Sequence, residues 1–305
     1  MGSTNLKGCG TALVTPFRKD GGLDEEALRR LVRFQVQEGI DFLVPCGTTG
    51  EAPTLEHDEY LRVVEIVLEE ARAAGRQVPV FAGAGGNYTA KVATLIRELE
   101  AMGADGILSV SPYYNKPTQE GIYQHYRLLN DQTCLPIIVY NVPGRTGSNI
   151  EVSTLARLAA LPNIAAVKEA SGNITQMAEV INAVPEGFAV LSGDDAITLP
   201  LMALGGVGVI SVASNEIPGM MARLTSLCLA GDFVEARSLN RRLLPLMQAN
   251  FIESNPIPVK AALAMMGLIE ESYRLPLAPM KPENRAKLER ILDGMGLLAQ
   301  ARHSA

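Results

Sequence analysis

The feature that most constrains the fold is a regular recurrence of short apolar runs, each followed by a longer amphipathic stretch. The runs are continuously apolar rather than alternating, and they are rich in β-branched residues. Such runs are typical of parallel strands that are buried on both faces of a sheet. We predict strands at Thr11–Val14, Phe42–Val44, Val78–Ala82, Gly106–Val110, Ile137–Tyr140, Ala165–Lys168, Phe188–Leu191 and Val207–Ser211.

The stretches between the runs carry apolar residues at helical spacing, which predicts helices that cover a sheet. In the first stretch, Leu28, Leu31 and Val32 lie near one helical face. In the second, Thr54 is expected to cap the start of the helix. The predicted helices are Asp24–Glu38, Thr54–Ala74, Thr89–Met102, Thr118–Leu129, Val152–Leu161, Thr175–Ala183 and Ala196–Leu204.

The alternation of strands and helices predicts an α/β fold, one closed (β/α)8 TIM barrel. A doubly wound open sheet is the alternative, but it normally has fewer strands and a Gly-x-Gly-x-x-Gly turn after the first, which this sequence lacks. After about residue 225 the pattern is helical throughout, with candidates at Asp232–Gln248, Pro258–Gly267 and Glu283–Gly294. We expect a catalytic barrel domain at 1–225 and a C-terminal helical extension at 226–305.

Composition narrows the range of functions. The chain has 305 residues, a net charge of -6 and 47% hydrophobic residues. A net negative charge repels phosphate backbones, so we expect no nucleic-acid partner. The apolar runs fall short of the roughly 18 residues of a membrane span, and a secretory signal pattern is missing, so we expect a cytoplasmic location without membrane contact. The cysteines and histidines are scattered, and we expect no metal.

Candidate catalytic residues are sought at the carboxyl ends of the strands, where TIM barrels place their active sites. Lys168 closes the sixth run. Burial there would lower the pKa of its ammonium group, and a neutral amine can attack a carbonyl to form an imine. The alternative is a structural lysine at the barrel rim or paired with Glu169. Tyr140 ends the fifth run and could transfer protons, or be a rim aromatic with an ordinary hydrogen bond.

Candidate binding groups follow other strands. The turn Gly47–Glu51 offers the hydroxyls of Thr48 and Thr49 and backbone N–H groups, which suit a carboxylate; an ordinary βα turn is the alternative. Arg145 could bind a second carboxylate bidentately, or anchor its loop. Tyr114, next to Tyr113, could belong to a relay, a binding wall or a subunit contact.

Glycine-rich strand ends are less specific. Gly193 and Ile210 end the seventh and eighth runs and could leave backbone atoms open to the barrel centre, or serve close packing alone. The segment Gly83–Asn87 is a weak match to a phosphate cradle because it lacks the lysine of a P-loop, and a tight turn is the preferred interpretation.

Seven segments in order and with similar spacing give the chain a resemblance to the dihydrodipicolinate synthase family. The resemblance covers residue 8 to about residue 295. Each segment alone is a weak signal, whereas the ordered set is specific. The segments are Gly10–Phe17, Gly47–Glu51, Tyr113–Pro117, Tyr140–Gly147, Val167–Gly172, Leu191–Asp195 and Asn255–Leu263.

This resemblance implies a Schiff base between Lys168 and pyruvate, with Tyr140 as the proton carrier. It implies that Tyr140 is connected through Thr48 to Tyr114, which reaches in from a neighbouring subunit. Thr49 would bind the pyruvate carboxylate, and the Ile210 backbone would lie near the imine.

The second substrate implied is aspartate semialdehyde, whose carboxylate Arg145 would bind. The implied assembly is a homotetramer made of tight dimers, with a dimer as the alternative because some members of the family are dimers. The implied chemistry needs no metal or organic cofactor, because the lysine does that work.

Three alternatives stay open. N-acetylneuraminate lyase and 2-keto-3-deoxy sugar acid aldolases share the lysine, the tyrosine and the glycine-rich turn, but Arg145 in Asn141–Gly147 favours a synthase. A barrel that only binds ligands is a second alternative, which the co-occurrence of the candidate residues opposes. A phosphate-handling isomerase, based on Gly83–Asn87, lacks a placed glutamate base.

One departure from the family concerns feedback inhibition by lysine. The positions of His57, Asn87 and Tyr113 match the inhibitory site of lysine-sensitive members, but Tyr60 and Lys91 stand where those members have a histidine and a glutamate. A cation at Lys91 would repel the lysine ammonium group. We therefore predict weak or absent inhibition.

Overall fold

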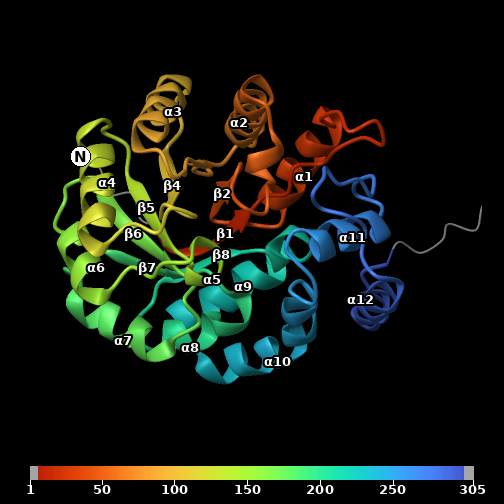
Figure 1. Cartoon of the computed structure of the whole chain (residues 1–305). Coiled ribbons are helices and arrows are strands. Elements are labelled where there is room, and N and C mark those ends of the chain that lie inside the picture. Colours follow the sequence, from red (N-terminus) through yellow and green to blue (C-terminus); the bar gives the residue numbers. More distant parts are fainter. Residues whose placement is uncertain (1–5, 299–305) are drawn as a thin grey trace, which may run out of the picture.

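The computed structural model describes residues 6–298, and within them eight strands form one parallel sheet that curls into a barrel surrounded by helices (Figure 1). The strand order along the sheet is β2-β1-β8-β7-β6-β5-β4-β3. The strands are β1 (Gly8–Ala12), β2 (Phe42–Val44), β3 (Phe81–Gly83), β4 (Gly106–Val110), β5 (Ile137–Asn141), β6 (Ile164–Glu169), β7 (Ala189–Ser192) and β8 (Gly208–Ser211).

The two ends of this sheet, β2 and β3, meet and close the barrel. Leu43 forms a parallel bridge with Val80, and its N–H donates to the Pro79 carbonyl at 2.9 Å. Further along the same two segments, the Gly83 N–H donates to the Pro45 carbonyl, also at 2.9 Å. The predicted TIM barrel is thus confirmed.

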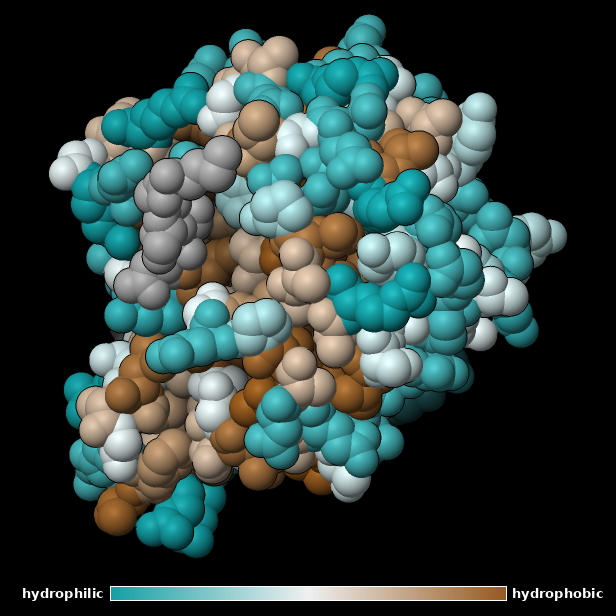
Figure 2. Space-filling view, turned by 90° about the vertical axis from the view of Figure 1, so that its left-hand side faces the viewer, coloured by the Kyte–Doolittle hydropathy of each residue, from teal (hydrophilic) through white to brown (hydrophobic). Residues whose placement is uncertain are grey.

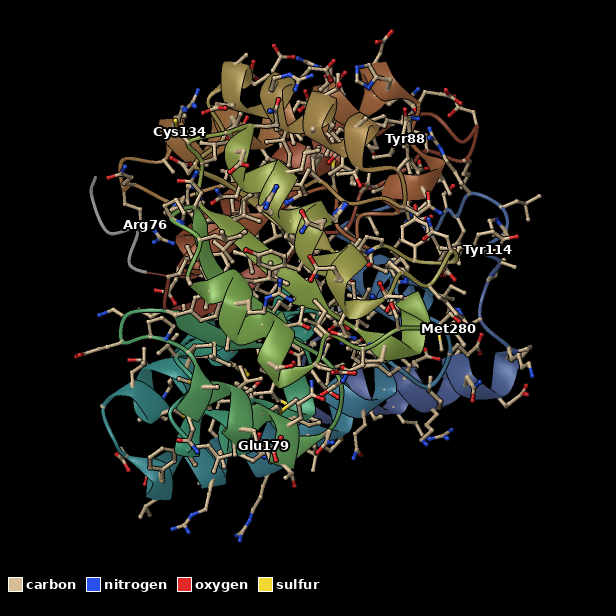
Figure 3. The ribbon with its side chains drawn as sticks, turned by 60° about the vertical axis from the view of Figure 1, so that its left-hand side comes forward. Arg76, Tyr88, Tyr114, Cys134, Glu179 and Met280 are labelled. Carbon is tan, nitrogen blue, oxygen red and sulfur yellow. The ribbon has the colours of Figure 1, made fainter. Side chains whose placement is uncertain are left out.

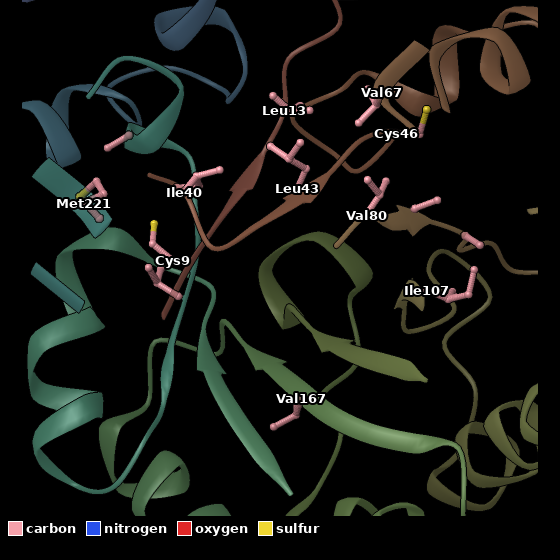
Figure 4. Close-up of a cluster of buried hydrophobic side chains, with 14 of the residues drawn as sticks. Cys9, Leu13, Ile40, Leu43, Cys46, Val67, Val80, Ile107, Val167 and Met221 are labelled. Atoms are coloured by element: carbon pink, nitrogen blue, oxygen red, sulfur yellow. The ribbon is translucent and has the colours of Figure 1, made fainter. Parts of the chain in front are cut away.

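Large rings fill the barrel interior beside this closure. Phe42 and Phe81 meet edge to face, with ring centroids 5.7 Å apart. Glycines on adjacent strands make room for them: a Cβ at Gly10 would lie 2.0 Å from a Phe42 ring atom, and one at Gly106 would lie 2.3 Å from a Phe81 ring atom. The apolar layer outside the strands includes Leu43 and other residues shown in Figure 4.

The helices form the outer ring, and their starts follow the capping residues of the sequence. Asp24 accepts from the Ala27 N–H at 3.0 Å at the first helix, and Thr118 accepts from the Gly121 N–H at 3.2 Å at the fourth. The ring consists of α1 (Glu25–Gln37), α2 (His57–Ala73), α3 (Thr89–Met102), α4 (Gln119–Asp131), α6 (Val152–Ala159), α7 (Ile174–Ala183), α8 (Thr198–Ala203) and α9 (Pro218–Leu229).

Most boundaries differ from the predictions by one or two residues, and three elements begin three residues away from their predicted starts. β1 begins at Gly8 because its two glycines, which weaken a strand signal, pair with β8. β3 begins later than predicted because Pro79 has no N–H to give to a ladder. The second helix begins at His57 with Glu56 as its cap, because the predicted cap Thr54 belongs to a 3-10 turn at Ala52–Thr54.

The C-terminal segment packs against α8 and α9 on the outside of the barrel (Figure 1). It contains α10 (Phe233–Ala249), α11 (Ile257–Met265) and α12 (Pro282–Gly294). The expectation that it is helical throughout was wrong for residues 268–281, which form turns and extended chain around two prolines. The predicted domain limit after residue 225 falls inside α9, and the division into two domains stays a prediction.

The outer surface of the molecule is formed mainly by the polar faces of the amphipathic helices. Seen from the side in Figure 2, it is mainly hydrophilic, with apolar residues gathered toward the middle and lower part of that face. Within residues 6–298, none of the helices is both long enough and apolar enough to cross a membrane.

Candidate active site

Lys168 lies inside the barrel because side chains of a strand alternate between its two faces. Ala166 belongs to the interior cluster and Val167 to the outer apolar layer, so Lys168 points inward again, and only 5% of it is exposed. β5 and β6 pair in a register that sets Tyr140 opposite Lys168. The Lys168 Nζ lies 4.3 Å from the centroid of the Tyr140 ring.

The surroundings of Lys168 favour its neutral amine. Burial lowers its pKa to about 8, a nearby carboxylate at Asp195 opposes this shift, and the positive charge of Arg145 adds to it. The Asp195 side chain is itself buried, and its Oδ2 accepts from the N–H groups of Val212 and Ala213 at 3.0 and 2.9 Å. A substantial fraction of Lys168 is therefore unprotonated at weakly alkaline pH.

Burial also shifts the pKa of Tyr140, but upward, because the charged form of a phenol is its deprotonated form. It raises the pKa of the phenol to about 12, although Arg145 and the Thr48 side chain lower it in part. The phenol therefore keeps its proton near neutral pH, and it is available as a proton donor to a group bound beside Lys168.

The turn Gly47–Glu51 follows β2 and brings Thr48 and Thr49 to this place. The Gly50 N–H donates to the Gly47 carbonyl at 3.1 Å, which closes the turn. The Thr49 hydroxyl accepts from the side-chain amide of Asn255 at 3.0 Å.

A cavity of about 30 Å³, roughly the share of one water molecule, brings these groups together. A larger, open cavity of about 620 Å³ shares Thr48, Tyr140 and Arg145 with it and extends outward. The small cavity is lined by Lys168, Tyr140, Thr48, Thr49, Arg145 and Gly193, together with Ala12, Gly47, Leu108, Val212, Phe251 and Asn255.

Arg145 and Gly193 have definite structural partners. Arg145 lies in a short helical turn, α5 (Pro143–Thr146), and its guanidinium donates to the Asn255 carbonyl at 3.3 Å. Gly193 donates its N–H to the Glu169 carbonyl at 2.8 Å, and a Cβ at this glycine would lie 3.1 Å from the Lys168 Cε. Glycine at this position therefore leaves room for the lysine.

The remaining predicted residues lie elsewhere. Ile210 is buried inside the barrel on β8, and it is not among the residues that line the small cavity. Tyr114 is 88% exposed, has a left-handed backbone (φ 73°) and lies at the edge of the molecule (Figure 3). It does not reach the Lys168 cavity of its own chain.

Glu169 does not pair with Lys168. Its carboxylate accepts from the Ser171 N–H at 2.7 Å and from the Asn141 side-chain amide at 3.0 Å. The alternation of the strand places the two side chains of residues 168 and 169 on opposite faces, so the structural-pair alternative for Lys168 is wrong.

Sequence reasoning missed Asp195, Phe251 and Asn255 as parts of the site. Asp195 and Asn255 appeared only inside segments that carried the family resemblance, and Phe251 gave no signal. An acid that follows a buried strand, as Asp195 follows β7, is the signal that could have been used.

A TIM barrel whose mouth holds a buried amine of lowered pKa beside a protonated phenol belongs to the barrel enzymes that form Schiff bases through a lysine. Comparison with known proteins narrows this class. The model of the dihydrodipicolinate synthetase family matches residues 5–295. The chain therefore belongs to this family.

Individual relatives agree over nearly the full length. A 4-hydroxy-tetrahydrodipicolinate synthase of Koribacter versatilis is 56% identical over 297 residues, which cover 97% of this chain and 98% of the relative. The crystal structure of dihydrodipicolinate synthase from Aquifex aeolicus has a TM-score of 0.93 and 44% identity, over 97% of this chain and all of its own. A structure described as a monomeric dihydrodipicolinate synthase variant has a TM-score of 0.94 and 45% identity, over 97% of this chain and 98% of its own.

The charges around Lys168 predict how its reactivity depends on pH. Its reductive methylation by formaldehyde and cyanoborohydride, followed by peptide mass spectrometry, should rise about tenfold per pH unit and level off above about pH 8. Arg145→Met should move this inflection to higher pH, because a positive charge is removed. Asp195→Asn should move it to lower pH, because a negative charge is removed. An inflection near the ordinary lysine pKa in all three proteins would contradict the burial argument.

Proposed function

We propose that the chain is a 4-hydroxy-tetrahydrodipicolinate synthase, which condenses pyruvate with L-aspartate 4-semialdehyde in the diaminopimelate and lysine pathway. The observation that carries the proposal is the buried Lys168 amine, which lies against Tyr140 in a cavity also lined by Arg145. The name of a relative that is 56% identical over almost the whole chain supports the choice of substrates.

In the first half-reaction, the neutral amine of Lys168 attacks the keto carbon of pyruvate. Tyr140 donates its proton to the departing oxygen, water leaves, and a protonated imine remains. The turn with Thr48 and Thr49 presents a hydroxyl and N–H groups to the pyruvate carboxylate. Binding the carboxylate at this turn fixes the direction from which the amine attacks.

In the second half-reaction, the pyruvate methyl group loses a proton to the Tyr140 phenolate left by the first half-reaction, and the protonated imine accepts the released electron pair. The resulting enamine carbon attacks the aldehyde carbon of the second substrate, whose carboxylate is bound by Arg145, and Tyr140 returns the proton to the aldehyde oxygen. The substrate amino group then attacks the imine carbon, closes the ring and releases the Lys168 amine. The positive charge of Arg145 also favours the neutral amine for the next cycle.

We also propose that the chain acts as a homotetramer of tight dimers in the cytoplasm. Tyr114 supports the dimer, because an 88% exposed tyrosine on a left-handed loop is placed to enter a second copy rather than its own cavity. Free thiols support a reducing compartment, since within the described chain all of Cys9, Cys46, Cys134 and Cys228 are unpaired.

Trapping with borohydride tests the central step. Pyruvate and borohydride should leave a reduced pyruvyl adduct on Lys168, found by peptide mass spectrometry, and Lys168→Met should abolish it. Lys91→Met, which removes an exposed amine outside the small cavity, should be labelled like the wild type. Enzyme that has not been treated with borohydride is then assayed for condensation of pyruvate with a series of aldehydes, beginning with aspartate semialdehyde. An unmodified Lys168 in folded protein would exclude the proposed chemistry.

Mixing of inactive subunits tests the role of Tyr114. Tyr114→Phe and Lys168→Met should each have low activity, since one lacks the proton path and the other the nucleophile. If Tyr114 serves the neighbouring subunit, dissociation and reassociation of a mixture should restore activity toward a quarter of wild type, because mixed dimers hold one intact site. A mixture that stays as inactive as its components would show that Tyr114 serves its own chain or none.

The larger cavity predicts the response to lysine. His57, Tyr60, Lys91 and Tyr113 all line it, so the cation at Lys91 faces the place where an amino-acid effector would bind. We expect weak or absent inhibition by lysine in a steady-state assay, and Lys91→Glu should increase inhibition. Inhibition of the wild type at micromolar lysine would contradict this expectation.

A further inference from the structure

A buried ion pair joins the substrate-binding turn to the C-terminal segment. Lys260, on α11, is fully buried, and its Nζ lies 2.5 Å from the Oε1 of Glu51. Glu51 is 2% exposed and is the last residue of the Gly47–Glu51 turn. The pair therefore links two parts of the chain that lie 209 residues apart.

The ammonium group of Lys260 has an unusual environment. Its Nζ lies 4.3 Å from the centroid of the Phe17 ring and 5.6 Å from that of Tyr273. Burial lowers the pKa of Lys260, and Glu51 opposes that shift. The aromatic faces and one carboxylate oxygen thus replace the water that an ammonium group normally binds.

The position of Glu51 constrains the rest of the turn through its backbone. Its backbone is left-handed (φ 53°), a conformation that is unfavourable for a residue with a side chain, and its N–H donates to the carbonyl of Thr48 at 3.1 Å. The two residues that precede Glu51 in the turn are also held by hydrogen bonds from outside the turn. Thr15 donates to the Gly50 carbonyl at 2.7 Å, and Asn255 donates to the Thr49 hydroxyl at 3.0 Å.

Stability alone is a poor reason for such a pair. Two buried charges lose their hydration, and replacing both by apolar groups is often neutral or stabilising. What an apolar pair cannot supply is a fixed direction, because only the charged pair holds the strained residue at the end of the turn to one point on α11.

We infer that Lys260 and Glu51 are positioning residues that hold Thr48 and Thr49 in the geometry that captures the pyruvate carboxylate. This inference rests on the proposed function, because it assigns the turn to that carboxylate. Lys260 itself touches neither the small cavity nor Lys168, so its effect passes through Glu51 and the backbone of the turn.

The test compares a double variant that removes both charges of the Lys260–Glu51 pair with a control variant at a second buried carboxylate. Glu51→Gln with Lys260→Met leaves no unpaired buried charge, so its urea midpoint should stay near wild type, whereas each single variant should be less stable. The KM for pyruvate of the double variant should rise on the order of tenfold, because a misplaced binding turn loses carboxylate contacts. The KM for the aldehyde should stay close to wild type, because Arg145 is carried by α5.

The control is Glu70→Gln, which removes the charge of a buried carboxylate on the outer helix α2. In the wild type this carboxylate accepts from Arg29 at 2.9 Å and from Arg33 at 2.6 Å, both on α1. It should lower stability without changing the KM for pyruvate. A stable double variant with a wild-type KM for pyruvate would overturn the inference.

If the double variant does not fold, Glu51→Asp answers the same question. It keeps the charge but shortens its reach by one methylene, and it should raise the KM for pyruvate. An unchanged KM would again overturn the inference. The proposed function fails separately, when the wild-type protein itself gives no pyruvyl adduct in borohydride trapping.

Discussion

Closure of the eight-stranded sheet is the constraint on which the rest of the structure depends. Once a parallel sheet closes, every second side chain points into a volume without solvent, and it must be apolar, small or chemically unusual. Phe42 and Phe81 fill that volume on one side. Lys168 and Tyr140 occupy its carboxyl end, where burial changes the pKa of both groups in the directions that imine chemistry needs.

The loops supply what the barrel cannot. An amine and a phenol on adjacent strands make a reactive centre but give it no selectivity. The turn after β2, the α5 turn with Arg145 and the connection that carries Asn255 converge on the centre from three distant stretches of the chain. The C-terminal segment therefore completes the site as well as covering the barrel.

The fold could be predicted from the sequence because continuous apolar runs and amphipathic stretches are local signals. The errors came where local signals were weak, as with the glycines of β1 and with Pro79. Lys168, Tyr140 and Arg145 could be found because each lies close to the carboxyl end of a strand or follows one. The proximity of Asp195 to Lys168 could not be predicted, since it arises from the packing of β7 against β6. The placement of Tyr114 in a second subunit rests on resemblance and remains a prediction.

The glycines that face the barrel rings have a consequence for how the sequence can change over time. Gly10 and Phe42 share one small volume, as do Gly106 and Phe81. A side chain at position 10 can grow only as the one at position 42 shrinks, so neither site is free to drift alone. Among descendants of this chain, accepted substitutions at these positions should therefore come as coupled pairs that conserve the summed volume, whereas exposed helical positions vary one at a time.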